Sequence, residues 1–408
     1  MKILVLLPFS PVPTDFGGAL RVFYLLKSLA SEHEVTVLVI STPEKTKLFR
    51  KIFDGVVKEI HLVPEPWTRN YKRLAQLYSI FSSRSYFNMN SFSKRIQPEI
   101  DKLLNENDFD VVHSEFPAMG CYKINTDLIR VNDAHNVEHD NFRKMWLNQR
   151  SPLRKWYYYR EFKKVTREEV TTLNNQDALL VTSEEDIAIL KRCLNNVPAY
   201  LVPNGVDTSY FKPSNGVSEP FSIVFTGMMA YTPNDDGILW FLDEIFPIIR
   251  KKIPQAKIYI VGKRPTERLQ RRQSKHVIVT GYVDDVRPYV WKSSIFVVPL
   301  RMGSGTRLKV VEALAMKKPV VSTTLGCEGI NVIPEESVLV QDDSVSFADS
   351  VVHLMHDKEQ REKLIQNGYN LVTSTYDWSV VGNHLLNAYK DFQTKEVKGG
   401  SDFIESKQ

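Results

Sequence analysis

The fold is decided by the first stretch of the chain, MKILVLLPFSPVPTDFGGALRVFYLLKSLASEHEVTVLVI (residues 1–40). Its segment Ile3–Pro8 is continuously apolar, which is typical of a parallel strand that helices cover on both faces. Apolar residues then recur at helical spacing from Leu20 to Leu29, and Glu34–Ile40 is rich in β-branched residues. The stretch therefore predicts a strand, a helix and a second strand of an α/β domain.

The same alternation of strands and helices continues to the end of the chain. In the first half, short apolar runs stand at 110–113, 129–131 and 178–181, with helical patterns between them. The second half repeats the pattern with runs at 222–226, 257–261, 277–280, 295–300 and 319–323. We therefore predict an α/β protein of two doubly wound, Rossmann-like domains that face a central cleft, where ligands of such folds bind.

A turn-forming segment separates the two halves. Val202–Asp207 contains Pro-Asn-Gly, which is turn chemistry, and we place the domain boundary there. The predicted domains are 1–200 and 201–378. A C-terminal helix, about 379–394, is expected to complete the first domain, and the polar residues 395–408 to form a frayed tail.

Composition excludes several classes of protein. Of the 408 residues, 43% are hydrophobic and 25% charged, as in a globular protein and unlike a disordered chain. A net charge of +5 is too small to indicate nucleic-acid binding. The three cysteines, Cys121, Cys193 and Cys327, are too few and too far apart for a disulfide framework or a zinc site, so we expect buried, reduced thiols in a cytoplasmic protein. No apolar run is long enough to span a bilayer, so any membrane contact is expected to be peripheral.

A loop of small residues in the second half has the chemistry of a phosphate site. It follows an apolar run that ends at Leu300 and precedes a helix that we expect to begin near Leu308. Its backbone amides can surround a phosphate because small side chains leave room for one. The loop consists of Gly303, Ser304, Gly305 and Thr306.

Three charged residues follow this loop at once. Arg307 and Lys309 can neutralise a diphosphate, and Glu312 can accept two hydrogen bonds from the hydroxyls of a ribose. Because Lys309 and Glu312 are three residues apart, they are neighbours on one face of the helix. A solvated ion pair on an ordinary amphipathic helix remains the alternative reading of Lys309 and Glu312.

A second pair of glycines, Gly17 and Gly18, stands between the first strand and the first helix. Glycines at that place let a ligand approach the backbone and the amides at a helix N-terminus. The full Gly-x-Gly-x-x-Gly pattern is absent, which counts against a nicotinamide or flavin dehydrogenase. The simpler alternative is that the two glycines only turn the chain.

Taken together, these motifs resemble the retaining, nucleotide-sugar-dependent family 4 glycosyltransferases of GT-B architecture. The resemblance covers most of the chain, from Gly17 to Trp378. It implies that domain 1–200 lies on the acceptor side and that domain 201–378 binds the nucleotide-sugar. It also implies that Glu312 binds the donor ribose and that the glycine pair approaches the diphosphate. The segments that carry it are Pro203–Asp207, Glu312–Ala315, Pro319–Thr324 and Tyr376–Trp378.

The chain departs from the family pattern at two places. The family commonly has a second acidic residue eight positions before the glutamate, where this chain has Ser304. We therefore expect loop amides or the hydroxyls of Ser304 and Thr306 to contact the donor sugar. The family's usual cations after the first strand of the second domain would fall near Met228 and Asp236, beside Gly227, and neither is a cation. We assign neutralisation of the diphosphate to Arg307 and Lys309 instead, and count Gly227 among the donor-binding residues.

His135 is the histidine that we single out in the first domain. It follows a short strand, and in the family a histidine of the matching loop lies beside the donor sugar, so we assign it a catalytic role together with Arg307 and Lys309. A structural histidine that hydrogen-bonds its own loop is the alternative. His113, at the end of another strand, is a weaker candidate because no catalytic motif surrounds it.

No metal or other cofactor is expected. Asp108-Phe109-Asp110 spells Asp-x-Asp, which holds a metal in other glycosyltransferase folds, but here it precedes a strand and is interpreted as loop carboxylates. Motifs of serine hydrolases, zinc proteases and P-loop proteins are absent.

Two segments of the first half mix cations with aromatic residues. They are Arg143–Lys164 and Trp67–Arg95. This mixture suits an anionic membrane surface, or an anionic or lipid-linked acceptor. The alternative is that the aromatic side chains pack in the core and the cations are solvated. Nucleic acid is not expected, since no recognition module accompanies the cations.

These observations lead to one functional hypothesis and two alternatives. We expect a cytoplasmic glycosyltransferase, at the inner face of the membrane, that moves a sugar from a UDP- or GDP-sugar to an acceptor hydroxyl with retention, in polysaccharide or glycoconjugate synthesis. A GT-B nucleotide-sugar epimerase and a non-catalytic nucleotide-sugar-binding protein are the alternatives.

Overall fold

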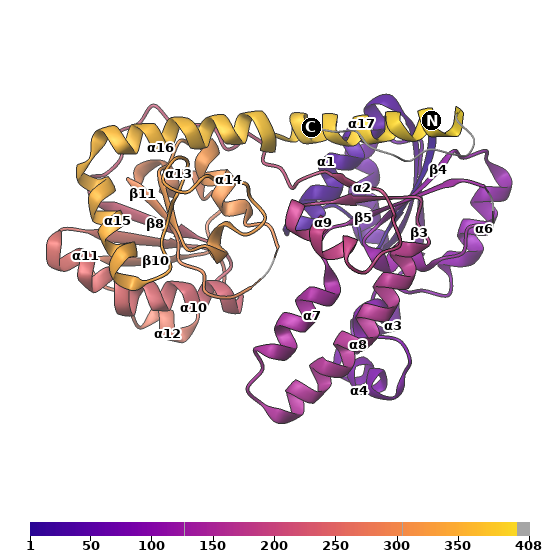
Figure 1. The fold of residues 1–408 in the computed structure, drawn as a ribbon, viewed down its shortest axis with the longest axis horizontal. Helices are drawn as coiled ribbons and strands as arrows, with labels where there is room; N and C mark the ends of the chain where they lie inside the picture. Colours follow the sequence, from indigo (N-terminus) through magenta and orange to yellow (C-terminus); the bar gives the residue numbers. More distant parts are fainter. Residues whose placement is uncertain (126, 304, 398–408) are drawn as a thin grey trace. The chain divides into compact units, whose positions relative to one another are not determined.

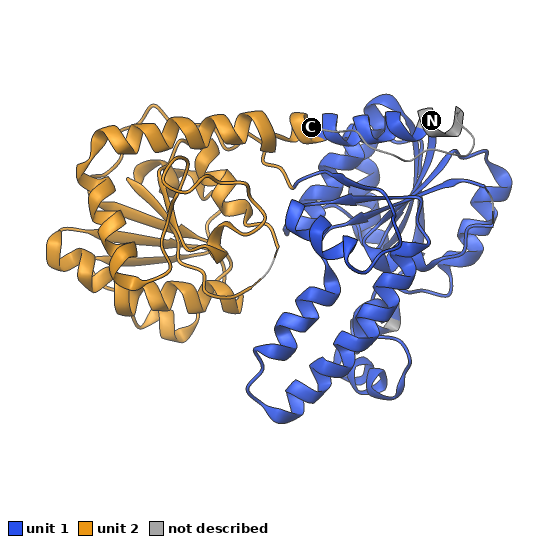
Figure 2. Ribbon diagram, viewed as in Figure 1, with its two compact units in different colours: residues 1–203, 382–408 blue, residues 204–381 orange. Residues whose placement is uncertain are grey.

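The computed structural model of the chain describes residues 1–125, 127–303 and 305–397. They form two compact units (Figure 2). Unit 1 contains residues 1–203 and the chain from Gly382 onward, and unit 2 contains residues 204–381. The sequence places the corresponding boundaries near 200 and 378.

Unit 1 is built on a seven-stranded sheet in the order β3-β2-β1-β4-β5-β6-β7. Every neighbouring pair is parallel. The order reverses between β1 and β4, which makes that place the switch point of the sheet, where ligands of such folds bind. The strands are β1 (Lys2–Leu7), β2 (Glu34–Ser41), β3 (Glu59–Pro64), β4 (Val111–Glu115), β5 (Ile129–Ala134), β6 (Ala178–Val181) and β7 (Ala199–Leu201).

Helices lie on both sides of this sheet, and a long hairpin of α7 and α8 extends away from it (Figure 1). The last helix of the chain, α17, reaches Val397 and so extends past its expected end at 394. The rest of the predicted tail, residues 398–408, lies outside the described residues. The helices are α1 (Gly17–Glu32), α2 (Pro43–Phe53), α3 (Trp67–Asn70), α4 (Lys72–Phe81), α5 (Tyr86–Met89), α6 (Ile96–Glu106), η1 (Pro117–Cys121), α7 (Glu138–Leu147), α8 (Pro152–Asn174), α9 (Glu184–Lys191) and, from Gly382 onward, α17 (Trp378–Val397).

Unit 2 has a six-stranded parallel sheet in the order β10-β9-β8-β11-β12-β13. Its order reverses between β8 and β11. The strands are β8 (Ser222–Thr226), β9 (Lys257–Val261), β10 (Val277–Gly281), β11 (Ile295–Val298), β12 (Val320–Ser322) and β13 (Leu339–Val340). The helices are α10 (Thr232–Trp240), η2 (Phe241–Ile245), α11 (Phe246–Lys252), α12 (Glu267–Gln270), α13 (Arg287–Lys292), α14 (Leu308–Ala315), η3 (Leu325–Cys327), α15 (Ser344–His356), α16 (Lys358–Leu371) and η4 (Val372–Tyr376).

The prediction of two doubly wound, Rossmann-like α/β domains is confirmed. The central strands are buried on both faces, as their continuous apolar runs indicate. The expectation of a shared cleft concerns the space between the units and stays a prediction.

The expectation of buried cysteines is wrong for two of the three. Cys121, the last residue of η1, is exposed, and Cys193, two residues after α9, is half-buried, whereas Cys327 is buried. All three thiols are free. Among the helices described, none is both long and apolar enough to cross a membrane.

Candidate active site

In unit 2, the small-residue loop and the end of β8 meet at the switch point of the sheet. β8 and β11 are hydrogen-bonded neighbours, and the chain leaves their carboxyl ends in different directions. Gly227 follows β8, and the loop that contains Gly303 follows β11. This is the place where open α/β sheets bind their ligands.

Lys309 brings a positive charge to this point. Its Nζ donates hydrogen bonds to the carbonyl oxygen of Thr226 (2.7 Å) and to Oδ1 of Asn234 (2.8 Å). The ammonium group also lies 4.3 Å from the centre of the Phe225 ring. An ammonium has three donors, so one remains for a ligand. Burial lowers the pKa of Lys309 to about 7, although part of the side chain stays exposed to solvent.

Two glycines allow the backbone to approach Lys309 and Asn234 closely. A Cβ atom on Gly227 would lie 2.7 Å from Nδ2 of Asn234 and 2.9 Å from Nζ of Lys309. A Cβ atom on Gly262, after β9, would lie only 1.7 Å from the carbonyl oxygen of Gly227. Any larger residue would therefore displace the lysine or separate the two strand ends.

The side chain of Arg307 lies next to Gly303 of the small-residue loop. Its guanidinium donates to the carbonyl oxygen of Leu325 and to the carboxylate of Glu328, both at 3.2 Å. Gly303 has φ +110°, and a Cβ atom there would lie 3.2 Å from Nη2 of Arg307. Burial lowers the pKa of Arg307. The two predicted cations are thus held differently, since Arg307 is paired with a carboxylate and Lys309 is bound only to neutral oxygens.

Glu312 lies one turn after Lys309 on α14. Burial raises the pKa of Glu312 to about 7, and the charge of Lys309 opposes that rise. The side chain is half-buried, and its carboxylate accepts no hydrogen bond from the residues that the structure describes. It is therefore available as a hydrogen-bond acceptor for a ligand.

The rest of the loop is joined to the turn that opens unit 2. Nδ2 of Asn204 donates to Oγ1 of Thr306 at 3.0 Å. Gly305 has φ +84°, a left-handed conformation that glycine adopts without strain. Ser304, which we expect to contact the donor sugar, lies outside the described residues.

Unit 1 carries a buried polar cluster at the ends of β4 and β5. Arg21, from α1, binds Asp133 through two hydrogen bonds of 2.8 Å, and both side chains are completely buried. A third hydrogen bond joins Arg21 to the carbonyl oxygen of Pro203 (3.0 Å). A bidentate Arg–carboxylate pair of this kind is stronger than a pair joined by a single hydrogen bond.

His135 belongs to this cluster. Its Nε2 lies 2.6 Å from Glu115, whose other oxygen lies 3.1 Å from Nε2 of His113. His113 contacts the hydroxyl of Tyr389 on α17 (2.6 Å). Burial alone would raise the pKa of Glu115, but the two histidines outweigh it and hold that pKa well below its usual range. Glu115 is therefore ionised and fixes the ring of His135.

The glycine pair of the first loop reaches the same cluster through Phe116. The Phe116 ring stacks on His135, with 3.8 Å between the ring centres, and its backbone has φ +66°, which is strained for a phenylalanine. A Cβ atom on Gly18 would lie 3.1 Å from the ring of Phe16 and 3.2 Å from that of Phe116. Gly17 begins α1. The two predicted features of unit 1 are thus neighbours.

Among the residues that the structure describes, this cluster is the one group whose ligand atoms lie close enough together to hold a metal ion. Ligand atoms of His113, Glu115 and Asp133 lie within 4.8 Å of one another. Each of these side chains already has a partner in Tyr389, His135 or Arg21. A metal would have to displace Arg21 and His135, so the residues do not fit a metal as they stand. Asp108 and Asp110 lie in the loop before β4, as interpreted, and Asp110 accepts from the backbone amide of Lys2 (2.7 Å).

Sequence reasoning missed Arg21, Glu115, Asp133 and Asn234. One signal was present, because Arg21 shares the buried face of α1 with Val22 and Leu25. A charged residue on an apolar stripe needs a buried partner. No local pattern indicates which carboxylate provides it.

Comparison with protein families gives two matches. Residues 17–210 match the family model described as "Glycosyltransferase Family 4", and residues 220–357 match "Glycosyl transferases group 1". Together the two matches cover most of the described chain.

Two relatives by sequence are similar to different lengths of the chain. An uncharacterised 44.6 kDa protein in the cps region of Klebsiella pneumoniae is 22% identical over 391 residues, which is 92% of this chain and 96% of that protein. A phosphatidyl-myo-inositol mannosyltransferase of Mycobacterium tuberculosis is 24% identical over 206 residues, 46% of this chain and 53% of that enzyme.

One solved structure with a similar fold is that of Anabaena HepE in complex with UDP. It covers 96% of this chain and 100% of its own, with a TM-score of 0.68 and 13% identity. At this identity, the likeness concerns the fold.

Proposed function

The chain is a glycosyltransferase, built from a Family 4 domain and a group 1 domain, and we propose that it moves a sugar from a nucleoside-diphosphate sugar to an acceptor hydroxyl with retention. The proposed donor is a UDP- or GDP-sugar, and the proposed acceptor belongs to a polysaccharide or glycoconjugate. The complex of HepE with UDP supports a nucleotide donor, and its complex with UDP and glucose supports a saccharide acceptor.

One observation carries the donor proposal. At the switch point of unit 2, a cation with an unused donor and a carboxylate with unused acceptors lie one turn apart on α14, beneath glycines. A nucleoside diphosphate has the complementary pair of groups, an anionic diphosphate and a ribose with two hydroxyls. We therefore assign the diphosphate to Lys309, Arg307 and the loop amides, and the ribose to Glu312.

In this proposal, the protein stabilises the leaving diphosphate and does little covalent chemistry. Negative charge develops on the leaving oxygen as the bond to the sugar breaks. Lys309 is held in place to stabilise it, and we assign the loop amides to the same task. The diphosphate takes the proton of the acceptor hydroxyl on the same face of the sugar, which gives retention. Glu115 holds His135 as a positioned hydrogen-bonding group for the sugar.

A panel of UDP- and GDP-sugars tests the reaction itself. Each donor is incubated with the protein and a mixture of saccharide acceptors, and the products are separated by mass and by NMR of the anomeric proton. Released nucleotide with transfer of the sugar and unchanged anomeric configuration supports the proposal. An isomerised donor would indicate an epimerase, and binding without turnover would indicate a binding protein.

Glu312→Ala is expected to weaken UDP binding about 10- to 100-fold. The reason is the loss of the hydrogen bonds from the ribose to the Glu312 carboxylate, whose combined net worth we take as that of one hydrogen bond to a charged acceptor, about 1.5–3 kcal/mol, because water binds the freed ribose hydroxyls in the variant. Binding of inorganic pyrophosphate, which has no ribose, should stay unchanged. Isothermal titration of both ligands measures the difference.

A matched control is Glu267→Ala, which removes an exposed carboxylate of α12 in the same unit. It should leave both affinities as they are. The ribose assignment is wrong if Glu312→Ala binds UDP as tightly as the unaltered protein.

We also propose that unit 1 docks on an anionic membrane through α4. The apolar face of this helix points outward, since Leu74, Leu77 and Phe81 are 60%, 59% and 89% exposed. These positions share one face of the helix, while the small residues Ala75 and Ser79 on the other face are buried. A soluble surface helix normally has the reverse arrangement.

Contacts with α8 explain why α4 lies this way round. Lys164, which is buried and paired with Glu161, donates a hydrogen bond to the carbonyl oxygen of Ser79. Arg160 donates to the carbonyl oxygen of Ile80 (3.0 Å). The polar backbone at the end of α4 is thus bound to α8, and the apolar stripe faces outward.

The charges around the exposed apolar face of α4 favour an anionic membrane, rather than a protein, as its binding partner. Residues 67–95 contain six Lys and Arg and no Asp or Glu. On the neighbouring helix α8, Leu153 and Trp156 are 82% and 49% exposed beside Arg154 and Lys155. Each such cation near an anionic surface contributes about 1 kcal/mol. The alternative of aromatic residues packed in the core does not describe these exposed positions.

The double variant Leu77→Glu/Phe81→Glu is expected to lower binding to vesicles at least about tenfold, because it removes two apolar side chains from the lipid and adds two negative charges. Flotation with vesicles of rising phosphatidylglycerol content measures binding. Val345→Glu, at a 55% exposed apolar position of α15 in unit 2, is the control. Binding that is equal with phosphatidylcholine alone, or equal in the double variant, would contradict the proposal.

A further inference from the structure

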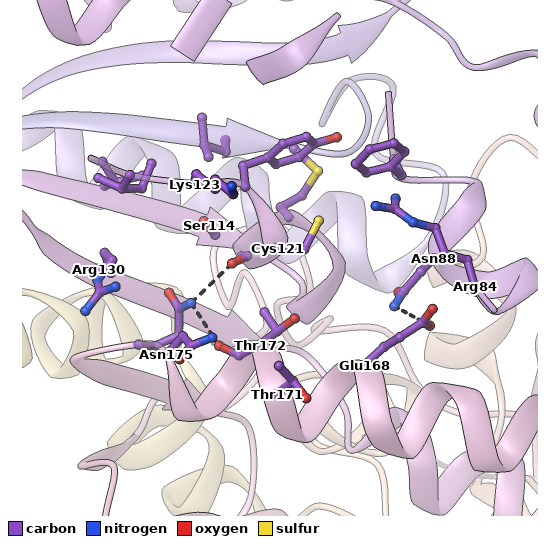
Figure 3. Close-up of a pocket in the computed structure, with 18 of the residues that line it drawn as sticks. Arg84, Asn88, Ser114, Cys121, Lys123, Arg130, Glu168, Thr171, Thr172 and Asn175 are labelled. Carbon is purple, nitrogen blue, oxygen red and sulfur yellow. Dashed lines mark hydrogen bonds between the residues drawn. The ribbon is translucent and has the colours of Figure 1, made fainter. Parts of the chain in front are cut away.

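Unit 1 contains a hollow of about 760 Å³ that the proposed function does not use (Figure 3). It exists because the connection from β4 to β5 is short. Among the described residues between Glu115 and Ile129, the five-residue η1 is the one helix, whereas a crossover between parallel strands usually carries a longer helix that covers the sheet. Leu6, Val112 and Ser114 of the sheet form the floor of the hollow, where each is only 1–3% exposed.

The hollow lies on the sheet face opposite the His135 cluster. Successive residues of a strand point to opposite faces. On β4, Val112 and Ser114 line the hollow, while the intervening His113 and the following Glu115 belong to the cluster. A ligand in the hollow is therefore separated by the sheet from His135, and the hollow is a site of its own.

Cations dominate the charge of its wall. Four of the lining residues are Lys or Arg, and one is acidic. The acidic one, Glu168, already accepts three hydrogen bonds, from the backbone and hydroxyl of Ser85 (2.9 and 2.5 Å) and from the amide of Asn88 (2.7 Å). It cannot readily neutralise the cations, which are Arg84, Lys123, Arg130 and Arg167.

Two of the four cations have a hydrogen-bond or ion-pair partner, and for the other two the described residues provide none. Arg130 is paired with Asp177, and Arg167 donates to the carbonyl oxygen of Ser83 (2.5 Å). The charged ends of Arg84 and Lys123 make no hydrogen bond or ion pair with any residue in the described part of the chain.

Arg84 is held in place by stacking. Its guanidinium lies 3.4 Å from the centre of the Phe92 ring, which fixes the plane of the group and leaves its N–H edges open. Figure 3 shows the side chain reaching from the segment after α4 toward the loop with Cys121. Thr171 and Asn175 of α8 add neutral polar groups to the same wall.

We propose that this hollow binds a phosphate monoester, with the phosphate at the open N–H edge of Arg84, Lys123 adding positive charge elsewhere on the wall, and the ester group beside Thr171 and Asn175. The volume suits a ligand of sugar-phosphate size, since small-molecule sites measure about 300–1,000 Å³. A planar guanidinium and an ammonium are the side chains that proteins use for phosphate. The phosphate can belong to a free sugar phosphate or to a lipid headgroup, because segment 83–92 directly follows α4.

The test is calorimetric titration of the full chain with glucose 1-phosphate. We expect saturable binding, none with glucose, and a loss of affinity of about 10- to 100-fold in Arg84→Ala/Lys123→Ala. Vesicles of phosphatidic acid that compete with glucose 1-phosphate would identify a lipid as the source, and vesicles that do not compete would identify a free phosphate. The affinity for UDP should be unchanged in this variant, which separates the hollow from the donor site.

Two further variants keep the result interpretable. Lys94→Ala/Lys102→Ala removes two exposed cations of unit 1 that do not line the hollow, and it should bind like the unaltered protein. Thr171→Trp fills the hollow from an exposed position of α8 and should abolish binding. The proposal is overturned if glucose binds as well as its phosphate, if glucose 1-phosphate does not bind, or if the Arg84/Lys123 variant binds it normally.

Discussion

Arg21→Met is expected to lower the unfolding free energy of unit 1 by about 3–5 kcal/mol, because it leaves the carboxylate of Asp133 buried without its partner. Arg21 and Asp133 are both completely buried and joined by two hydrogen bonds. The third hydrogen bond of Arg21, to Pro203, is lost as well. An uncompensated buried charge costs far more than the pair itself contributes.

Hydrogen exchange of the strands β4 and β5 in rising urea measures this loss within unit 1. The control is Arg130→Met, which breaks the bidentate ion pair of Arg130 with Asp177 at the same sheet. That pair is 39% and 45% exposed, so its loss should cost only about 0–1 kcal/mol. Equal losses in the two variants would mean that burial does not control the strength of the Arg21 pair.

The double variant Arg21→Met/Asp133→Leu distinguishes two causes of the lost stability. One is the missing attraction within the ion pair, and the other is the burial of an unpaired carboxylate. Replacing both members of a buried pair by apolar residues is often nearly neutral. We therefore expect it to recover most of the stability lost in Arg21→Met. A double variant as unstable as the single one would show that the hydrogen bond to Pro203, and not the ion pair, carries the stability.

Strands covered on both faces were predictable from the sequence because burial leaves a continuous apolar run. β8 and β9 begin and end where their runs do. β3 and β7 have no such run, since they are the partly exposed edges of the sheet of unit 1. β13 has only two residues, too few for any pattern.

The donor side of the site was more predictable than the His135 side. Gly303, Arg307, Lys309 and Glu312 are close in sequence, so a local pattern brings them together. The partners of His135 come from distant segments. Glu115 and Asp133 become neighbours through the parallel register of β4 and β5, and Tyr389 arrives on the last helix. Pairing of that kind is fixed by tertiary structure, so no spacing in the sequence reports it.

The second large effect is expected for Lys309→Met, which should lower turnover about 10²- to 10³-fold, the range for removing one donor that stabilises a developing negative charge. Lys309 is suited to this role because Thr226 and Asn234 fix its Nζ at the switch point before any ligand binds. No reorganisation is then needed when the charge develops on the leaving diphosphate. Methionine keeps most of the apolar stem of lysine but removes the ammonium, together with its contact with the Phe225 ring.

Measuring turnover and donor affinity separately decides how Lys309 acts. If it stabilises mainly the departing diphosphate, turnover at saturating donor falls by the full factor, and the affinity for the intact donor falls less. Lys275→Met, which removes an exposed cation of unit 2, should change neither quantity. Nearly full turnover in Lys309→Met would return the residue to the role of a structural lysine that closes the end of β8, and the leaving-group charge would then have to be stabilised by Arg307 and the loop amides alone.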